Sequence, residues 1–449
     1  MPAVSGEQYL LLMNIATDAA KPRPFYGYYL AIYAFTMGFL ASSFFLHSRG
    51  IFFPLWMEEF AVDKTRISLA VSLTLFAGSC MAPFTGYCLD RFPVRMVIAT
   101  ASLWLAAGYL LLQSADSFPM FLAVLILFQG LGWTGVGPLA QTKLMVSWFT
   151  RNRGMALGVA IMGISVAGVV MPTAVTWLSE TLGWRGTYVG YAIILIALVV
   201  PLTLLMVKQS PEEVGQHPDG DPEPPAAASA VAATVAGASK EAESSTAGTG
   251  QSLFATYREF LTSKAFWSVV ITFGLMNGVY SAMITHLPTY MTTELGFSLY
   301  DASYLLGIAG GFAIGGKLVW GWLMDNMNAR LTVMCAVAAY LASTVIFLST
   351  SSYVWLSLAA GLFGLGFGGM VPVRSVLISR LFGVKKFSRV NGLLSFFLAP
   401  ATFWVLITGF IADQTGTYTT AFQVWAVAFV LAGCISAVVR LPNREDAVP

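Results

Sequence analysis

A short charged loop joins two apolar stretches of this chain, and it reads Gly86-Tyr87-Cys88-Leu89-Asp90-Arg91-Phe92-Pro93-Val94-Arg95. The flanking stretches, 67–89 and 94–114, are each long enough to cross a bilayer as a helix, which takes about 20 residues. A shorter copy, Gly321-Trp322-Leu323-Met324-Asp325, ends another apolar stretch at 302–324. A charged loop that recurs between apolar spans predicts a membrane protein made of two similar halves.

The composition places the whole chain in the membrane class. Of its 449 residues 57% are hydrophobic and 10% are charged, whereas soluble domains carry about 25% charged residues. The chain has no basic run of the kind that follows a phosphate backbone, so nucleic acid is not an expected partner. We predict twelve membrane spans, at 25–50, 67–89, 94–114, 119–147, 154–179, 186–207, 265–292, 302–324, 331–349, 353–381, 389–412 and 418–440.

One connection divides these spans into six and six. Residues 208–262 are rich in Ala, Ser, Gly, Pro and Glu, a composition that cannot bury enough apolar surface to order itself. We therefore expect an all-α fold of two pseudo-symmetric six-helix bundles. The predicted parts are a cytoplasmic tail (1–24), the first bundle (25–207), a disordered cytoplasmic linker (208–262), the second bundle (263–440) and a cytoplasmic tail (441–449).

The distribution of cations predicts the orientation in the membrane. With both termini inside, most of the 24 Lys and Arg fall on cytoplasmic segments, and the outer loops carry only Lys64, Arg66 and Arg185. Positive charge favours the cytoplasmic side, so we expect a multi-pass protein of the cell membrane with both termini in the cytoplasm.

Four cations, Arg49, Lys143, Lys317 and Arg374, fall inside predicted spans, with no Asp or Glu at comparable depth. Ionisable residues within spans usually face a bundle interior or a water-filled cavity and are functional candidates. A cationic interior without a buried carboxylate predicts that the protein handles small anions.

The repeated loop resembles the signature of the major facilitator superfamily, although Asn326 replaces the Arg in its second copy. Finer features resemble the branch of monocarboxylate porters and oxalate–formate exchangers. They include Trp148-Phe149-Thr150-Arg151-Asn152-Arg153-Gly154 before the fifth span, Gly183-Trp184-Arg185 before the sixth, His286-Leu287-Pro288 in the seventh and Asp413-Gln414-Thr415-Gly416 before the twelfth. The resemblance implies secondary transport of a small organic anion by alternating access.

The resemblance carries two site roles over to this chain. His47, in His47-Ser48-Arg49-Gly50, stands where animal monocarboxylate porters have a substrate-linked lysine, and Lys317 stands where the family usually has its substrate-binding arginine. Lysine keeps the charge but loses the bidentate fork that suits a carboxylate. Ala313 replaces the aspartate of proton-linked members, which leaves the proton route open, and the eleventh span lacks the second lysine expected of an oxalate exchanger.

The remaining candidates rest on residue type and depth. Arg49 lies two residues from His47, so the two side chains diverge by about 200° on a helix and cannot both face one spot. Snorkelling to an interface is the alternative for Arg49, Arg374 and Lys143, and partial snorkelling or a structural pair is the alternative for Lys317. Core packing or interhelical hydrogen bonding is the alternative for His286, Gln141, Asn277 and Tyr280. Further substrate ligands are predicted at Arg374, Gln141, Asn277 and Tyr280, and the proton carrier at His47 or His286, since histidine titrates near neutral pH.

The charged loops are expected to act as mechanical parts. A carboxylate at a helix end can pair with a neighbouring cation in one conformation and lose it in another. By the family resemblance, Asp90 latches the two bundles together on the cytoplasmic side. The predicted latch residues are Gly86, Asp90, Arg91, Arg95 and Arg153, with Asp325 and Arg389 in the second half.

We therefore expect a transporter of a small organic anion, a monocarboxylate above all, with proton symport and without a cofactor, acting as a monomer in the lipid bilayer. Anion exchange is the close alternative; export of a drug-like solute and a non-transporting ligand sensor are further ones. The sequence lacks a GxxxxGK[ST] phosphate loop, an HExxH metal motif and a GxSxG elbow, which argues against an ATP-driven pump or a hydrolase.

Overall fold

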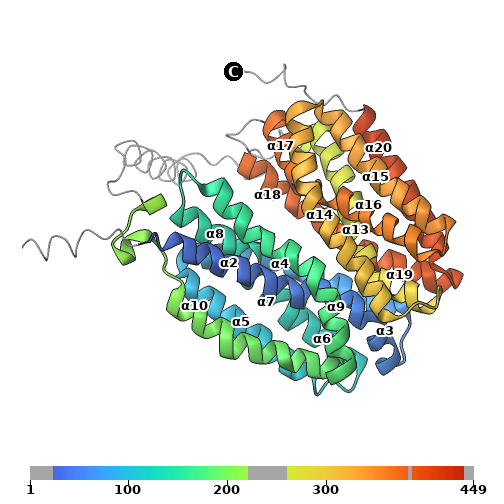
Figure 1. The fold of residues 1–449 in the computed structure, drawn as a ribbon, viewed down its shortest axis with the longest axis horizontal. Coiled ribbons are helices and arrows are strands. Elements are labelled where there is room, and N and C mark those ends of the chain that lie inside the picture. The colour runs from blue at the N-terminus through green and yellow to red at the C-terminus, as the bar shows by residue number, and fades with distance from the viewer. Residues whose placement is uncertain (1–23, 221–259, 383–386, 439–449) are drawn as a thin grey trace, which may run out of the picture.

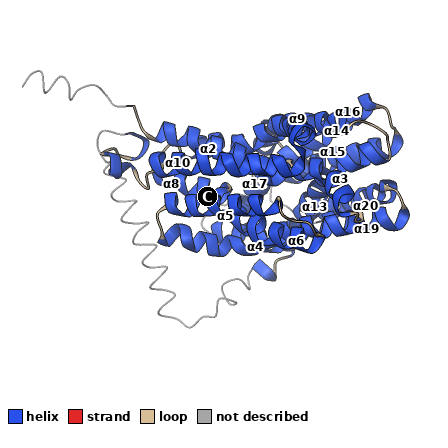
Figure 2. Ribbon diagram, turned by 90° about the horizontal axis from the view of Figure 1, so that it is seen from below, coloured by secondary structure: helices blue, strands red, loops and turns tan. Residues whose placement is uncertain are grey.

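The computed structural model describes residues 24–220, 260–382 and 387–438, and within these ranges the chain forms helices joined by short loops, without a strand (Figure 2). The side chains at 325, 371, 372, 387–389 and 438 lie outside the description. The described residues form two helical halves, the N-terminal half (24–207) and the C-terminal half (260–438), which confirms the predicted all-α fold.

The N-terminal half contains the first six spans, and local signals fix where its helices begin. Asp63 caps the second span by accepting a hydrogen bond from the Arg66 backbone N–H at 2.8 Å. Its elements are α2 (Gly27–Ser42), η1 (Ser43–His47), α3 (Arg49–Phe60), α4 (Lys64–Arg91), α5 (Val94–Leu112), α6 (Phe118–Val124), η2 (Leu125–Gly130), α7 (Leu131–Val136), α8 (Pro138–Trp148), α9 (Arg153–Ile194), η3 (Leu195–Val199) and α10 (Val200–Met206).

One helical run in this half is too long for a single crossing. Residues Arg153–Met206 form 54 consecutive helical residues, about 81 Å at 1.5 Å each, against a hydrocarbon core of about 30 Å. The run breaks at Gly183, whose φ of 70° and ψ of 166° lie outside the helical region. Its two arms are the fifth and sixth spans, so the 11 helical segments long and apolar enough to cross a membrane correspond to twelve crossings.

The first part of the predicted linker is structured. Residues 208–220 contain η4 (Pro211–Val214) and η5 (Pro218–Gly220). The Asp219 carboxylate accepts hydrogen bonds from the Thr150 hydroxyl at 2.6 Å and from the backbone N–H groups of Thr150, Arg151 and Asn152 at 2.9, 2.7 and 3.1 Å. This segment therefore fastens the end of the sixth span to the start of α9, and residues 221–259 lie outside the described part.

The C-terminal half repeats the arrangement. A capping box between Ser298 and Asp301 begins its second helix, since each side chain bonds the other's backbone N–H. Its elements are α13 (Lys264–Thr293), α14 (Leu299–Asn326), α15 (Ala329–Ser349), α16 (Tyr353–Gly368), α17 (Met370–Phe382), α18 (Phe387–Leu398), η7 (Ala399–Phe403), α19 (Trp404–Thr415) and α20 (Tyr418–Val438).

The two halves meet at one end and diverge at the other. Figure 1 shows α3 and α19 side by side, whereas α10 and α17 extend in different directions. The helix pairs in contact across the boundary include α4 with α19 and η7, α3 with α13, and α9 with α14. The last pair approaches closely, because a Cβ atom on Gly310 would lie 2.6 Å from the Gly168 carbonyl carbon.

Candidate functional site

One turn of α9, residues 164–168, brings the two family-matched candidates together. From the C-terminal half, Lys317 of α14 donates a short hydrogen bond to the Ser165 hydroxyl. From the N-terminal half, the His47 ring packs on Gly168, where a Cβ atom would lie 3.0 Å from its Cε1. His47 and Lys317 therefore reach the same turn of α9 from opposite sides of the boundary.

A π-helical turn presents His47. The turn, η1, leaves carbonyl groups that ordinary helix bonds do not use: Ser43 O accepts from the Ser48 hydroxyl at 2.6 Å, and Phe44 O accepts from Gln129 Nε2 at 3.2 Å. Single π turns inside helices are frequent at functional sites. His47 is 8% exposed, and its Nε2 has no hydrogen-bond partner among the described residues.

Arg49 faces a different helix from His47, in agreement with their spacing. Its Nη2 donates to the Ser281 hydroxyl of α13 at 3.0 Å, across the boundary between the halves. Arg49 is 7% exposed, and its Nε and Nη1 are buried without a partner within the described part of the chain. A buried cation without an anion is unfavourable, so this guanidinium has unused capacity to bind one.

Of the two α13 candidates, Asn277 lies on the face that carries Ser281, because it precedes Ser281 by four residues, and it is half-buried. Tyr280 precedes Ser281 by one residue and lies about 100° around the helix from it. The Tyr280 ring stacks on Phe367 of α16 with its centroid 3.3 Å away, so it also packs the C-terminal half.

Gln141 and Arg374 also have unused hydrogen-bonding capacity. Gln141 is 3% exposed beside Gly38 of α2, and both of its amide atoms lack partners among the described residues. Arg374 of α17 is half-buried, and its Nε is enclosed without a partner in the same described ranges. Among the described residues no hydrogen bond joins either side chain to the turn at 164–168.

His286 is a fully bonded core residue. Its Nε2–H donates to the Val405 carbonyl at 3.0 Å, with the Ser68 hydroxyl 3.3 Å away, and its Nδ1 accepts from the Tyr418 hydroxyl at 3.0 Å. These partners lie on α19, α4 and α20, so His286 ties α13 to three other helices. A side chain with both nitrogens occupied has less freedom to carry a proton than His47.

The closed end of the boundary, which we call the α4–α19 seam, is built around Lys64–Ser72. Asp413 accepts from the Thr65 backbone N–H and hydroxyl, both at 2.6 Å, and from the Lys64 N–H at 3.3 Å. Lower along α4, the Ser72 hydroxyl donates to Thr402 O and accepts from the Leu406 N–H, both at 3.1 Å. Gly409 allows this approach, because a Cβ atom there would lie 2.1 Å from the Ser68 hydroxyl.

At the opposite end of α4, the predicted latch residues bond within their own half. Lys143 donates to Asp90 at 2.6 Å, and Arg153 donates to the carbonyl oxygens of Phe149 and Val146 at 3.2 and 3.4 Å. Arg91 is exposed, Arg95 is half-buried, and a Cβ atom on Gly86 would meet open space. The side chains of the remaining predicted latch residues, Asp325 and Arg389, lie outside the described part.

The assignment of Lys143 to an acid-free interior is wrong. Its side chain is 43% exposed and pairs with Asp90, which approaches from the end of α4. A lysine stem of four carbons lets the ammonium group reach the helix end, so sequence depth alone overstated its burial.

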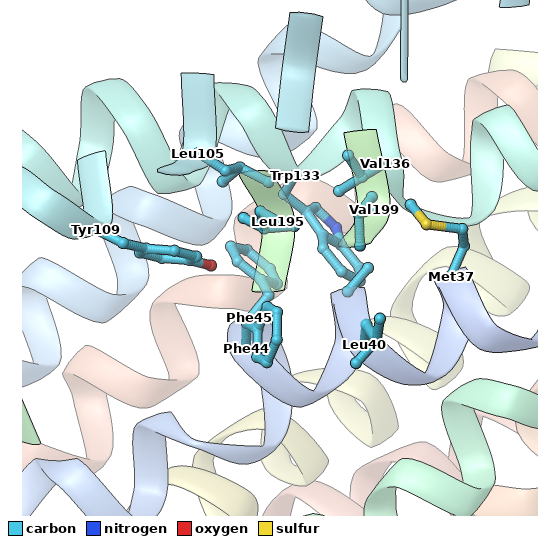
Figure 3. A pocket seen from close by; sticks show the side chains of 11 residues that line it. Met37, Leu40, Phe44, Phe45, Leu105, Tyr109, Trp133, Val136, Leu195 and Val199 are labelled. Atoms are coloured by element: carbon cyan, nitrogen blue, oxygen red, sulfur yellow. The ribbon is translucent and has the colours of Figure 1, made fainter. Parts of the chain in front are cut away.

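An apolar cavity inside the N-terminal half is a packing feature rather than a binding site. Figure 3 shows Phe44, Phe45, Tyr109 and Trp133 around it, and the Phe45 and Trp133 rings are stacked 4.4 Å apart. The space of about 10 Å³ holds about one water molecule.

Sequence reasoning missed Ser165, the partner of Lys317, and Gln129, which bonds the π turn. Gln129 is a polar residue within an apolar stretch and was a visible signal, whereas Ser165 is one of many small residues on α9. Asp413 was also visible in the sequence, as part of the stretch that resembles the family, but its place in the α4–α19 seam was not predicted.

Comparisons with known proteins agree with this architecture. The sequence profile of the Major Facilitator Superfamily matches residues 30–399 and 314–448. The chain is 24% identical over 409 residues to the MFS-type transporter YcxA of Bacillus subtilis (strain 168), covering 87% of this chain and 89% of that protein. It is 24% identical over 412 residues to monocarboxylate transporter 13 of Rattus norvegicus (89% and 85% covered) and 25% identical over 420 residues to monocarboxylate transporter 11 of Homo sapiens (90% and 81%).

Solved structures share the fold. A bacterial homologue of the human lysosomal transporter Spinster, in an inward-facing and unoccupied conformation, matches with a TM-score of 0.69 at 15% identity, covering 95% of this chain and 99% of that one. A POT family transporter in complex with 5-aminolevulinic acid matches with a TM-score of 0.70 at 14% identity, covering 91% and 95%. Profile, relatives and fold agree: the chain belongs to the Major Facilitator Superfamily, is related to its monocarboxylate transporter branch, and is a membrane transporter rather than an enzyme.

Proposed function

We propose that this protein moves a small organic monocarboxylate, such as lactate, pyruvate or a related acid, across the cell membrane by alternating access, with proton symport. The observation that carries the proposal is the meeting of Lys317 and His47 on one turn of α9, at the boundary between the halves. The printed names of the relatives, which include monocarboxylate transporters, support the same substrate class.

Lys317 has a weak partner that a substrate can replace. The Ser165 hydroxyl is a neutral acceptor, and among the described residues Lys317 has no carboxylate partner. The hydroxyl leaves the positive charge of the ammonium group unpaired, whereas a carboxylate would add ion pairing to the hydrogen bond. A substrate carboxylate would therefore displace Ser165 and recover part of the hydration that it loses at this depth.

His47 is the proton carrier in this proposal. Its Nε2 is unpartnered in the described part of the chain and lies on the turn that Lys317 contacts, whereas both nitrogens of His286 are bonded. A proton on His47 and a carboxylate at Lys317 would cross together, and the free imidazole would return without substrate.

Arg49 and the α13 face form the second part of the substrate path. With Asn277 and Tyr280, Arg49 would attract the anion toward Lys317 when the halves separate at the seam. Gln141 and Arg374 supply polar atoms for the path on the other side. The assignment of Arg49, Gln141 and Arg374 is supported by their buried atoms without a hydrogen-bond partner among the described residues. The assignment of the α13 face is supported by its contact with Arg49 across the boundary.

The structure supports a transport cycle of two states. We assign the α4–α19 seam to the outer face and the latch residues to the cytoplasmic face, with both termini in the cytoplasm. The structure then corresponds to the inward-open state, in which the seam is closed and Asp90 is paired with Lys143 instead of the other half. The latch would form when the seam opens. We propose that a monomer performs this cycle.

Counterflow in proteoliposomes tests the proposed substrate class. Vesicles loaded with unlabelled lactate or pyruvate should accumulate the labelled acid, and an inward acid gradient should drive net uptake. Counterflow without acid-driven uptake would indicate an anion exchanger. Absence of counterflow for every small acid would refute the proposal and leave a drug exporter or a ligand sensor.

A further inference from the structure

An apolar groove runs along the outer surface of the N-terminal half, between α4, α5 and α7. Its volume is about 640 Å³, and its lining includes Phe84, Cys88, Phe92, Met96, Thr100 and Trp104. Phe84, Phe92 and Trp104 are 57%, 52% and 47% exposed, and every lining residue belongs to α4, α5, α7 or the loop at 92–93, so the C-terminal half contributes no residue to the groove. None of the lining residues is a proposed substrate ligand, and an exposed apolar surface of this kind would face lipid in a bilayer.

The length of the groove fits one leaflet of a bilayer. On α5 it extends from Pro93, at the helix end, to Trp104, about 17 Å farther along the axis at 1.5 Å per residue. Half of the hydrocarbon core is about 15 Å thick. The groove thus begins at the membrane surface and ends near the bilayer centre, which is the path of a single acyl chain.

The mouth of the groove is positively charged. Arg91 and Arg95 flank the lining residues Phe92 and Pro93 in the sequence. The Asp90 carboxylate does not neutralise them, because it is paired with Lys143 at 2.6 Å. Among the described residues neither arginine forms an ion pair. Basic residues at the membrane surface attract anionic lipids by about 1 kcal/mol each.

We propose that this groove binds an anionic phospholipid, with one acyl chain between α4, α5 and α7 and the phosphate group at Arg91 and Arg95. The apolar length of the groove and the charge at its mouth match the two parts of such a lipid. A neutral lipid would leave the arginines unmatched, and a helix of a second copy would be wider than an acyl chain. The bound lipid would touch the loop that carries Asp90.

Quenching of Trp104 by brominated lipids measures occupancy of the groove. The Trp104 signal is the difference between the fluorescence of the wild-type protein and of Trp104→Phe in vesicles of the same composition. Brominated phosphatidylglycerol at low mole fraction should quench this signal several-fold more than brominated phosphatidylcholine does. Combining Arg91→Gln with Arg95→Gln should remove the preference for phosphatidylglycerol.

A filled groove provides the second arm of the test. Thr100 is exposed in the groove and its hydroxyl bonds Met96 O of its own helix, so Thr100→Phe should occupy the groove and reduce quenching by both lipids. Thr181→Phe is the matched control, because Thr181 is also exposed and bonds Trp177 O of its own helix, far from the groove.

Three results would overturn the proposal. The first is equal quenching of the Trp104 signal by the two brominated lipids. The second is a preference for phosphatidylglycerol that persists when both arginines are replaced. The third is that neither lipid quenches Trp104 while two copies of the protein form a disulfide cross-link through Cys88. The last would show a second copy in the groove. Monodisperse elution and an unchanged helical circular dichroism spectrum establish that each variant is folded.

Discussion

Asp413 should control which end of the protein is open. Its carboxylate is held by three hydrogen-bond donors at the start of α4, in the other half, so its bonds exist only while the seam is closed. Asp413→Ala removes these bonds and so raises the free energy of the inward-open state, whereas the outward-open state loses no such bonds. The variant should therefore favour the outward-open state.

The size of the shift follows from the bonds lost. A hydrogen bond to a charged group contributes about 1.5–3 kcal/mol, and a partly exposed cluster of three that share one carboxylate belongs near the low end of that range in total. We take about 2 kcal/mol, which corresponds to a shift of roughly 30-fold in the equilibrium between the two states, within the range usual for conformational coupling. Asp413→Asn keeps an acceptor oxygen and should give a smaller shift, of about 1 kcal/mol.

Electron–electron distances between spin labels at Ala61 and Gln414 report the shift, because both residues are exposed at the end where α4 and α19 meet. Asp413→Ala should increase the population with the longer distance. Asp301→Ala is the matched control, since the Asp301 carboxylate caps its own helix by accepting from the Ser298 N–H at 3.0 Å and hydroxyl at 2.7 Å. A distance distribution for Asp413→Ala that equals those of the wild type and of Asp301→Ala would refute the assignment of the seam as a gate.

Asp90→Asn should increase labelling of single cysteines on the cytoplasmic side and slow net transport, because its exposed pair with Lys143 contributes at most about 1 kcal/mol while the latch contributes about 1–3; unchanged labelling and rate would mean that Asp90 only shapes its loop. His47→Gln should abolish acid-driven accumulation and keep counterflow, whereas His286→Gln should keep both at a reduced rate; full acid-driven accumulation in His47→Gln would disprove its role as the carrier. Partial burial by itself would raise the Asp219 pKa, but the hydrogen bonds from residues 150–152 outweigh it and hold that pKa below its ordinary value. The attachment of residues 208–220 should thus be complete above about pH 4 and lost as the pH falls through the lowered pKa, and Asp219→Asn should weaken it at neutral pH by about 0.5–1 kcal/mol, seen as faster limited proteolysis after residue 208; equal cleavage rates at pH 7 would exclude this anchor.

The sequence was sufficient to predict the spans, because a bilayer requires long apolar stretches. Glycine or charged residues mark where these stretches end. The break at Gly183 lies between the predicted spans 154–179 and 186–207, although the structure continues the helix on both sides of it. The divergence of His47 and Arg49 also followed from spacing, since the two residues are only two positions apart, at the end of the π turn and at the start of α3.

Contacts between helices far apart in the chain were beyond a single sequence. Nothing in the residues around Lys143 shows that Asp90 reaches it, and the bond between Lys317 and Ser165 depends on how the two halves are tilted in one conformational state. The composition of the linker predicted disorder from its first residue. Composition averages over positions, and it missed that Asp219 alone supplies an acceptor for four donors at the start of α9.

Uptake of labelled monocarboxylate by Lys317 variants in proteoliposomes tests the central claim most directly. Lys317→Ala should abolish both counterflow and acid-driven uptake while the protein still inserts and elutes as a folded species, because the ammonium group that binds the carboxylate is then lost. Lys317→Arg should retain measurable transport, since the charge persists and the guanidinium can pair with a carboxylate. Normal uptake by Lys317→Ala would contradict the account and remove Lys317 from the substrate site.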